Sequence, residues 1–229
     1  MRELELPDVQ DVMLEYRKIK LLYRSALKEI RTKLEILNDE FRLVHQYNPI
    51  EHIESRLKTD ESITRKLMRK GKEITVENIQ KYIDDIAGVR VICSFPDDIY
   101  KLAESFLKQD DITLIERKDY IKNPKPSGYR SLHLIVQVPI FLQNEKKMVN
   151  VEVQFRTIAM DFWASLDHKM RYKKELSDEE VEILQEELYD CARQSAALDE
   201  RMQGIRDRIT KKQEQETILL EDKNSKDWL

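Results

Sequence analysis

The stretch that decides the fold class is Met148-Val149-Asn150-Val151-Glu152-Val153-Gln154-Phe155-Arg156. Its apolar residues alternate with Glu152, Gln154 and Arg156, and a period of two residues is typical of a β-strand with one buried and one polar face. A strand whose polar face only meets solvent would show the same pattern. The segments around this strand therefore decide whether its polar face has a function.

These neighbouring segments predict a mixed α/β centre. The predicted elements are strands at 89–95, 112–117, 131–138 and 148–156, and helices at 50–57, 75–83 and 97–108. They rest on β-branched runs, on apolar residues three or four apart, and on breaks such as Asn48-Pro49. The last two strands are expected to form a hairpin through residues 143–147.

Long amphipathic helices are predicted on both sides of this centre. Apolar residues recur three or four apart from Asp11 to Tyr47, and from Val181 to Ile209 they follow an a/d heptad pattern. The heptads fit either a helix packed on the protein's own core or a helix that forms an oligomer. We divide the chain into an N-terminal helix (1–47), a central domain (48–175) and a C-terminal oligomerisation region (176–229), whose last dozen residues are expected to fray.

The composition excludes several classes of protein. The 229 residues include 40 Lys or Arg and 44 Asp or Glu, a net charge of −4, with 41% hydrophobic positions. Such a chain can fold around a core, but it lacks the broad cationic excess of a duplex-DNA binder. The four glycines form no Gly-rich phosphate loop. With two distant cysteines, no leader-like start and no long apolar run, we expect a cytoplasmic protein without a membrane partner.

The net charge is an average over segregated segments. Residues 56–72 carry seven Lys or Arg against two acids, a local charge of +5, and residues 117–130 carry five against one, a local charge of +4. From Glu175 onward, 16 acids face eight bases, a local charge of −8. Two compact cationic segments favour small phosphorylated ligands over a long polyanion.

Two carboxylates predict a metal site beside these cations. Asp85 precedes the strand at 89–95, so it can stand near Glu152 if the two strands are neighbours. Such a pair suits Mg²⁺, which shares its coordination with water and substrate phosphates. One of the carboxylates can also take a proton from a hydroxyl nucleophile. Acids are common at helix C-termini, so the pair alone is a weak signal.

A basic loop at 117–133 adds a predicted nucleotide site. Its Lys and Arg residues alternate with Tyr120 and Tyr129, a mixture that suits phosphates and a stacked base. Gly128 would let the backbone approach a ligand closely. The alternative is a solvated cationic loop that turns at Ser127-Gly128.

Three motifs in this order resemble the RelA/SpoT-type (p)ppGpp synthetase domain. They are Asp85-Ile86-Ala87-Gly88-Val89-Arg90, Ser127-Gly128-Tyr129-Arg130-Ser131-Leu132-His133 and Glu152-Val153-Gln154-Phe155-Arg156-Thr157. Phe162-Trp163-Ala164, Asp167-His168 and Tyr172-Lys173 extend the resemblance, which covers residues 48–175. It implies a nucleotidyltransferase-like α/β fold with a mixed sheet flanked by helices. With helices on both sides and no other domain, the chain is similar to small alarmone synthetases of the RelP/RelQ kind, closer to RelP in Met160-Asp161-Phe162-Trp163.

The resemblance implies a GTP or GDP diphosphokinase of the bacterial stringent response. Such an enzyme moves the β,γ-pyrophosphate of ATP to the 3′-hydroxyl of GDP or GTP and releases AMP with ppGpp or pppGpp. The implied cofactor is Mg²⁺, and the implied assembly is a homotetramer joined through the terminal helices. Alarmone hydrolysis is not expected, because the four histidines, at 45, 52, 133 and 168, include no His-Asp dipeptide.

The resemblance also assigns roles to individual residues. Asp85 and Glu152 would bind Mg²⁺, and Glu152 would activate the 3′-hydroxyl. The implied ATP-binding residues are Arg56 and Arg90 around the adenine, with Lys58, Ser62, Lys66 and Arg69 on the phosphates. The implied GDP- or GTP-binding residues are Tyr129 stacked on guanine, Lys118, Lys125 and His133 on the phosphates, and Gln154, Arg156 and Asp161 in support.

Two of these positions depart from the family pattern. Asp161 stands where some relatives have Asn, although Asp can accept from the N1 and N2 donors of guanine. Lys118 stands where relatives can have Arg, and it lacks the bidentate fork of a guanidinium. His133 and His168 also fit ordinary structural roles, and His168 is not assigned to catalysis.

A competing hypothesis is a helical module that binds RNA or a regulatory nucleotide without chemistry. Asp85 and Glu152 argue against it, because a pure anion binder would avoid carboxylates that repel phosphates. An oligomeric scaffold built on the heptads is compatible with an enzyme.

Overall fold

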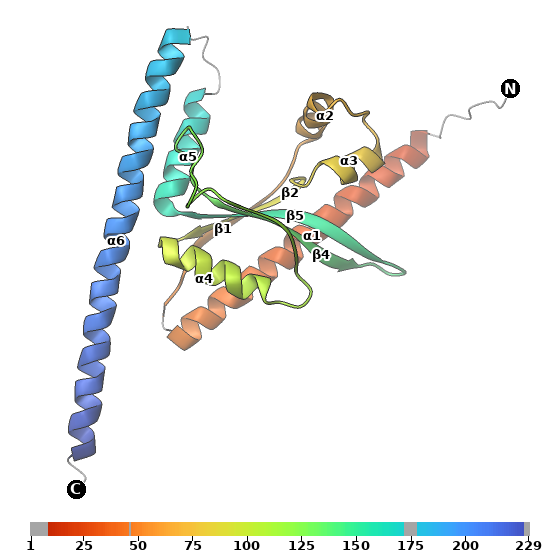
Figure 1. Cartoon of the computed structure of the whole chain (residues 1–229). Helices are drawn as coiled ribbons and strands as arrows, with labels where there is room; N and C mark the ends of the chain where they lie inside the picture. The colour runs from red at the N-terminus through yellow and green to blue at the C-terminus, as the bar shows by residue number, and fades with distance from the viewer. Residues whose placement is uncertain (1–8, 46, 172–177, 227–229) are drawn as a thin grey trace, which may run out of the picture.

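The structure, a computed structural model, describes residues 9–45, 47–171 and 178–226. Within these residues, five strands form one mixed sheet in the order β1-β2-β5-β4-β3, with β2 parallel to β5 and the other neighbours antiparallel (Figure 1). The strands are β1 (Ile50–Leu57), β2 (Ala87–Cys93), β3 (Thr113–Asp119), β4 (Leu132–Phe141) and β5 (Lys146–Thr157). The helices are α1 (Val9–His45), α2 (Asp60–Arg69), α3 (Val76–Tyr82), α4 (Pro96–Leu107), α5 (Ile158–Arg171) and α6 (Asp178–Lys226). The predicted fold class is confirmed.

The core lies between one face of the sheet and the helices α1 and α4, which cross that face (Figure 1). The alternation of β5 is confirmed, because Val151, Val153 and Phe155 are fully buried. Ile30 and Leu34 of α1 are also fully buried in the same core. Each large apolar side chain removed from water contributes about 1.5–3 kcal/mol. The polar residues of the strands are left on the opposite face.

The prediction for residues 50–57 is wrong, because they form the edge strand β1 and not a helix. A shift in the pairing with β2 occurs between Ile50 and His52, which moves the strand's alternation by one residue. As a result Ile50, Ile53 and Leu57 all pack toward the core, at a spacing that resembles a helix. Pairing with β2 satisfies the backbone of both segments and decides for the strand.

Helix α2 lies within the basic segment 56–72, where no helix was predicted. Thr59 caps it, since its Oγ1 accepts a hydrogen bond from the backbone N–H of Ser62 at 3.3 Å. Ile63 and Leu67 anchor the helix in the core. Ser62, Lys66 and Arg69 follow at spacings of four and three residues, so they share one side of α2.

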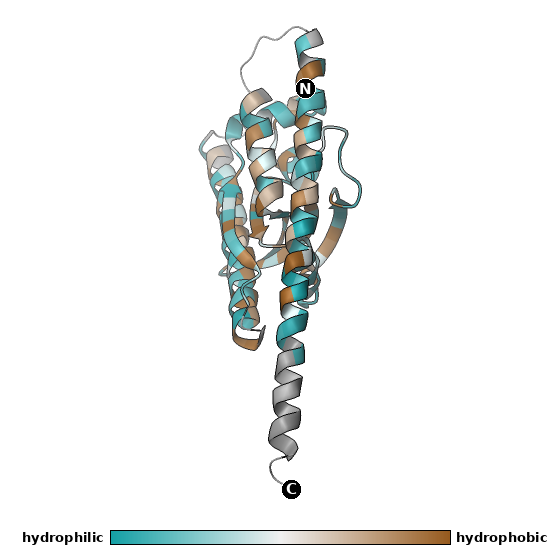
Figure 2. Ribbon diagram, turned by 90° about the vertical axis from the view of Figure 1, so that its left-hand side faces the viewer, coloured by the Kyte–Doolittle hydropathy of each residue, from teal (hydrophilic) through white to brown (hydrophobic). Residues whose placement is uncertain are grey.

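Helix α6 lies along α5 and α4 (Figures 1 and 2), and its heptad residues divide between two environments. Leu188 is buried with Ala192 against Trp163 of α5. Leu198, Met202 and Ile209, in contrast, expose 55%, 48% and 55% of their surface. The helix therefore packs on its own chain at Leu188 and leaves apolar heptad residues uncovered further along.

The helix α6 also continues to Lys226, through most of the segment that was expected to fray. The segment includes Leu219, Leu220, Glu221, Lys223 and Lys226, whose residue types are good helix formers. Tyr172 and Lys173, which belong to the motifs quoted above, lie outside the described residues. Among the helices that the structure describes, none has the length and apolar character needed to cross a bilayer.

Candidate active site

The site is built on the polar face of the sheet, where five strands present side chains in register. Gly88 of β2 pairs with Arg56 of β1 and with Glu152 of β5. One step along the strands, Gln154 pairs with Arg90 on one side and with His133 on the other. The parallel pairing of β2 with β5 is the arrangement that was needed to bring Asp85 toward Glu152.

Glu152 lies at the centre of this face with a half-buried carboxylate. Its Oε2 accepts a hydrogen bond from Nε2 of Gln154 at 2.7 Å, and its Oε1 lies 3.3 Å from Nδ1 of His133. Burial alone would raise the pKa of Glu152, but the hydrogen bonds from His133 and Gln154 outweigh it and hold that pKa below its ordinary value. Glu152 is therefore ionised at neutral pH.

Asp85 lies at the edge of the same face between two lysines. Its carboxylate oxygens lie 2.7 Å from Nζ of Lys58 and 2.8 Å from Nζ of Lys66. Burial raises the pKa of Asp85, but the hydrogen bonds from the Lys58 and Lys66 ammonium groups lower it by more. The pKa of Asp85 is therefore below its ordinary value. The negative charge of Asp85 is a minor cause that raises the pKa of Glu152.

This donor set fits a divalent cation that is completed by substrate. Among residues 9–45, 47–171 and 178–226, no cluster of three or more His, Cys, Asp or Glu side chains forms a self-sufficient metal site. Two carboxylates with neighbouring cations for phosphate groups are the usual protein share of a Mg²⁺–nucleotide site. Asp85 and Glu152 are thus the candidate metal ligands, as the sequence predicted.

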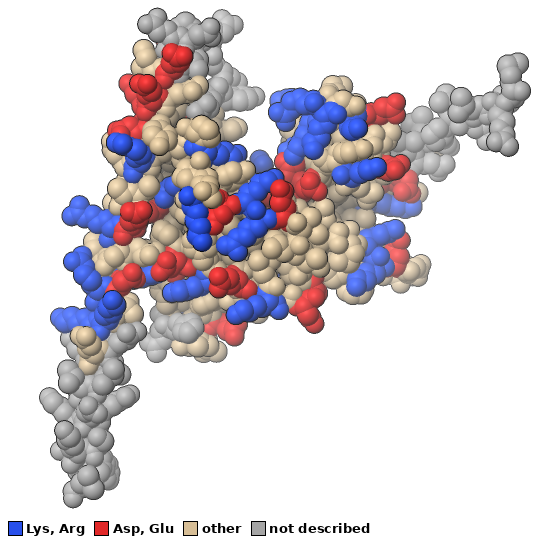
Figure 3. Space-filling view, in the orientation of Figure 1, with Lys and Arg blue, Asp and Glu red and all other residues tan. Residues whose placement is uncertain are grey.

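The predicted ATP residues line a hollow beside the carboxylates. Arg56 and Arg90 lie on neighbouring strands and line a cavity of about 280 Å³ together with Gly88, Glu152 and Gln154. A side chain at position 88 would occupy space beside Arg56, at 3.7 Å from its Cγ, so Gly88 keeps this floor open. In the space-filling view, Lys and Arg gather around acidic side chains in the notch between the α5–α6 side and the α2–α3 side (Figure 3).

The predicted phosphate-binding residues of the ATP set come from α2 and from the segment just before it. Lys58 and Lys66 contact Asp85, whereas Ser62 is half-buried in the first turn of α2, next to the capping residue Thr59. Arg69 lies at the end of the same helix with an exposed side chain. The structure therefore joins the two lysines to the carboxylates and places Ser62 and Arg69 further along one helix side.

Two further residues on this side were missed by the sequence analysis. Glu54 of β1 contacts Arg90, with Oε2 at 3.2 Å from Nη1, and Arg31 of α1 lines the 280 Å³ cavity. The Glu54 contact follows from strand pairing, because Glu54 and Arg90 are partners in the β1–β2 register. Predicting residues 50–57 as a helix hid that signal.

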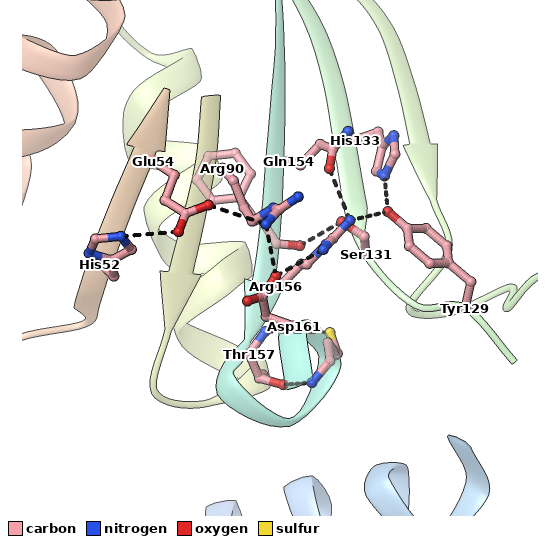
Figure 4. Close-up of polar contacts among 12 residues, drawn as sticks. His52, Glu54, Arg90, Tyr129, Ser131, His133, Gln154, Arg156, Thr157 and Asp161 are labelled. Carbon is pink, nitrogen blue, oxygen red and sulfur yellow. Dashed lines mark hydrogen bonds and ion pairs between the residues drawn. The ribbon is translucent and has the colours of Figure 1, made fainter. Parts of the chain in front are cut away.

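Most of the predicted acceptor residues form a connected network of side chains (Figure 4), namely Tyr129, His133, Gln154, Arg156 and Asp161. The hydroxyl of Tyr129 lies 2.8 Å from Nε2 of His133 and accepts a hydrogen bond from Nη2 of Arg156 at 2.7 Å. Arg156 also donates to Oε1 of Gln154 at 3.1 Å, which leads back to Glu152. The network thus connects the candidate base to the tyrosine predicted to stack on guanine.

Asp161, one of the two departures from the family pattern, joins the two halves of the face. Its Oδ1 lies 2.9 Å from Nη1 of Arg156 and 3.4 Å from Nη1 of Arg90 (Figure 4). The Asp161 carboxylate therefore contacts both Arg90, which is predicted to bind adenine, and Arg156, which is predicted to support binding of the acceptor nucleotide. Asp161 has one oxygen engaged by both guanidinium groups.

Aromatic and cationic side chains surround Tyr129. The Nζ of Lys125 lies 5.0 Å from the Tyr129 ring centre and 4.6 Å from that of Tyr120, and the guanidinium carbon of Arg156 lies 5.2 Å from the Tyr129 ring centre. Both tyrosine rings stand edge-on to His133, at centroid distances of 5.3 and 5.8 Å. The predicted combination of basic and aromatic groups is thus assembled around one strand end.

Lys118 and Gly128 differ from their expected roles. Lys118 pairs across the sheet with His133, but its ammonium binds Glu116 at 2.8 Å, and that hydrogen bond raises the pKa of Lys118. Gly128 has a φ of +85°, and a Cβ there would lie 2.4 Å from Cβ of Ala192. The close backbone approach that Gly128 permits is thus to helix α6, and not to a ligand as expected.

His168 lies on a second wall of the site. It lines a cavity of about 560 Å³ with Arg56, Arg90, Tyr129 and Arg156, and this larger hollow connects the two predicted nucleotide sites. The structure places His168 on the wall of this hollow. The sequence analysis had left it out of catalysis.

A sheet face with two interacting carboxylates, a ring of cations and an aromatic cluster defines a class of enzyme that acts on nucleotide phosphates. Comparison with known proteins is more specific. The profile described as "Region found in RelA / SpoT proteins" matches residues 55–177. The chain belongs to the RelA/SpoT family.

Two curated relatives from Bacillus subtilis are similar over most of their length. The GTP pyrophosphokinase YwaC is 47% identical over 204 residues, which cover 89% of this chain and 96% of YwaC. The GTP pyrophosphokinase YjbM is 36% identical over 191 residues, which cover 83% of this chain and 88% of YjbM. The predicted resemblance to small synthetases of this family is confirmed.

Crystal structures of Bacillus subtilis proteins share the fold. Small alarmone synthetase 2 superposes with a TM-score of 0.75 at 44% identity, over 85% of this chain and 99% of that chain. Small alarmone synthetase 1 bound to its product pppGpp has a TM-score of 0.76 at 34% identity, over 85% and 98%. The same protein bound to AMPCPP has a TM-score of 0.71 at 32% identity, over 86% and 98%.

Proposed function

We propose that this protein is a (p)ppGpp synthetase, which transfers the β,γ-pyrophosphate of ATP to the 3′-hydroxyl of GDP or GTP. The observation that carries the proposal is Glu152, an ionised, half-buried carboxylate that contacts His133 and Gln154. Family membership and the GTP pyrophosphokinase relatives support the same reaction. The AMPCPP and pppGpp named for small alarmone synthetase 1 correspond to a donor analogue and a product of this reaction.

The reaction needs one proton acceptor and neutralisation of phosphate charge. The 3′-oxygen of the acceptor forms a bond to the β-phosphorus of ATP, the bond from that phosphorus to the α–β bridging oxygen breaks, and AMP leaves with that oxygen. Glu152 takes the proton of the 3′-hydroxyl, since its lowered pKa keeps it ionised. Asp85 and Glu152 would hold Mg²⁺, which would neutralise charge on the transferred phosphates when bound.

The remaining residues bind and orient the two nucleotides. Lys58 and Lys66 exchange Asp85 for the phosphates of ATP, while Arg56 and Arg90 flank the adenine across the hollow beside Gly88. On the other side, Tyr129 stacks on guanine, and Lys125 and His133 meet the acceptor phosphates. Holding the nucleophile and the β-phosphorus in line is the largest part of such catalysis.

Product analysis tests this function directly. Incubation of the protein with ATP, GDP and Mg²⁺, followed by anion exchange, should give AMP and ppGpp in equal amounts, and EDTA should abolish both. Nucleotide binding without either product would favour the non-catalytic binding module instead. Incubation with ppGpp alone should leave it intact, because we propose no hydrolase activity for this chain.

We also propose that α6 joins copies of this chain in a homotetramer in the cytoplasm. The exposed heptad residues Leu198, Met202 and Ile209 provide an apolar surface for this purpose. Replacing Leu198 and Met202 together by Glu should yield a smaller species in light scattering. Replacing the buried Leu188 instead should destabilise the fold, so it serves as the contrasting variant. An unchanged mass for the Leu198/Met202 variant would contradict the proposed assembly.

A further inference from the structure

One carboxylate of α6 connects the two segments that hold the acceptor network. Asp199 exposes 6% of its side chain, and its Oδ2 accepts hydrogen bonds from Nη2 of Arg130 at 2.9 Å and from Oγ1 of Thr157 at 2.8 Å. Arg130 directly follows Tyr129, and Thr157 directly follows Arg156. Oδ2 of Asp199 on α6 therefore links Arg130 and Thr157. These are the neighbours in sequence of Tyr129 and Arg156, whose side chains contact each other.

The same side of α6 supports the acceptor loop at further points. Tyr129 packs against the cluster of Trp163 and Ala164 of α5 with Leu188 and Ala192 of α6. Nε1 of Trp163 donates to the backbone oxygen of Leu188 at 2.9 Å. Together with the close approach of Gly128 to Ala192, these contacts make α6 the back wall of the acceptor side.

The donor side is held by different contacts. Lys58 and Lys66 bind Asp85, and Arg90 binds Glu54 of the edge strand. Arg90 also contacts Asp161 of α5, which the acceptor side shares through Arg156. Those contacts lie in β1, β2, α2 and α5 and their connections. A substitution in α6 should therefore weaken nucleotide binding at the acceptor site much more than at the donor site.

We infer that Asp199 is a positioning residue for the guanine nucleotide: it sets acceptor affinity by holding Arg130 and Thr157, without touching the nucleotide. The inference rests on the proposed function, since it takes Tyr129 and Arg156 to bind the acceptor. Two hydrogen bonds to one buried charged oxygen fix the relative position of the loop and the end of β5. Loss of the charge lets the loop move relative to β5, and the ring of Tyr129 then no longer meets Arg156 in one geometry.

The test compares isosteric substitutions at two buried aspartates, Asp199 on α6 and Asp98 on α4, each of which links α6 to the rest of the protein. Asp199→Asn removes the charge beside the acceptor loop. Asp98→Asn is the matched control, because Asp98 is 3% exposed and binds Arg206 of α6 at 3.2 Å, on the α4 side of the helix. Asp199→Asn should raise KM for GDP about tenfold and change KM for ATP less than twofold, because a hydrogen bond to a charged group is worth about that factor or more. Asp98→Asn should change neither KM more than twofold.

Equal rises of both KM values in Asp199→Asn, or the same pattern in Asp98→Asn, would show a merely structural role and overturn the inference. An unchanged KM for GDP would do the same. Should Asp199→Asn not fold, Arg130→Lys weakens the same contact from the loop side and should raise KM for GDP several-fold with KM for ATP unchanged. A uniform effect of Arg130→Lys on both substrates would also overturn it.

Calorimetry separates this inference from the proposed reaction. If the unmodified protein binds GDP but makes no AMP or ppGpp, the reaction is wrong, and a tenfold weaker GDP binding by Asp199→Asn would still support the positioning role. If product forms and GDP binds Asp199→Asn as tightly as the unmodified protein, the reaction stands and the positioning role is wrong. AMPCPP binding should be the same in both proteins.

Discussion

The donor and acceptor sides of the site are built in different ways. On the donor side, Arg56 is exposed and Lys58 and Lys66 each contact one carboxylate at the edge of the face. On the acceptor side, the Arg156 side chain is 7% exposed and contacts Tyr129, Gln154 and Asp161 at once. Cations that each make a separate contact suit a triphosphate that carries its own charge, whereas a connected network around the buried Arg156 suits recognition of one base and one hydroxyl.

This contrast indicates how selective each of the two sites is for the base of its nucleotide. Stacking between guanidinium groups tolerates many bases, because every base presents a π face. A site with fixed hydrogen-bond donors and acceptors rejects a ligand that leaves them unpaired. We therefore expect the acceptor site to discriminate between bases more strongly than the donor site does.

Asp85 is one of the two candidate metal ligands, so its loss should have the largest effect among the variants that probe this contrast. Asp85→Asn removes a candidate metal ligand and the partner of both lysines. We expect the rate of pyrophosphate transfer to fall about 10²-fold or more, because stabilisation of transition-state charge is lost. Single-turnover rates at saturating ATP and GDP measure this. A loss confined to KM for ATP would assign Asp85 to the donor side alone.

Tyr129→Ala should affect only the acceptor side. Loss of base stacking is worth about 1–3 kcal/mol, so KM for GDP should rise about 5- to 150-fold, whereas KM for ATP should change little. Steady-state kinetics with each substrate varied in turn would check this. A comparable rise in KM for ATP would show that the two sides are not separate.

Arg56→Ala should produce the reciprocal, smaller effect on the donor side. An exposed cation over an aromatic base contributes about 0.5–1 kcal/mol, so KM for ATP should rise about two- to fivefold. KM for GDP should stay within error. If this substitution changes KM for GDP and leaves KM for ATP unchanged, the assignment of the two sides is reversed.

The smallest predicted effect concerns stability at low pH. The pKa of Asp85 is lowered in the folded protein, so its ion pairs stabilise the fold fully above the pKa of an unfolded-state aspartate, about 3.9. That contribution is lost as the pH falls from there through the folded-state pKa. Urea unfolding at pH 7 and at pH 3 should show a smaller drop in stability for Asp85→Asn than for the unmodified protein. An equal drop would mean that the two lysine contacts do not stabilise the folded state.

Much of the fold followed from the sequence because local patterns carry it. The alternation of β5 predicted its buried and polar faces, and the apolar spacing of α1 predicted a long helix that covers the core. The prediction of a helix at residues 50–57 was wrong because the register shift in this edge strand gives its apolar residues a spacing that resembles a helix. The heptads of α6 were ambiguous because they contain both a packed and an exposed part, and only the fold separates Leu188 from Leu198.

The candidate site divides in the same way. Motif resemblance placed Asp85, Glu152, Tyr129 and Arg156, and the structure brings them onto one face. The contact of Asp199 with Arg130 joins residues 69 positions apart and leaves no periodic trace in the sequence. The role of Gly128 was misplaced for the same reason, since its neighbour Ala192 lies on a helix far along the chain.

The most direct test of the central claim is the single-turnover rate of Glu152→Gln with ATP, GDP and Mg²⁺. Glu145→Gln, at an exposed turn before β5, is the matched control. Glu152→Gln should form AMP and ppGpp about 10²-fold or more slowly while both nucleotides still bind, and Glu145→Gln should keep the full rate. Turnover by Glu152→Gln at the rate of the unmodified protein would contradict the claim that this carboxylate takes the proton.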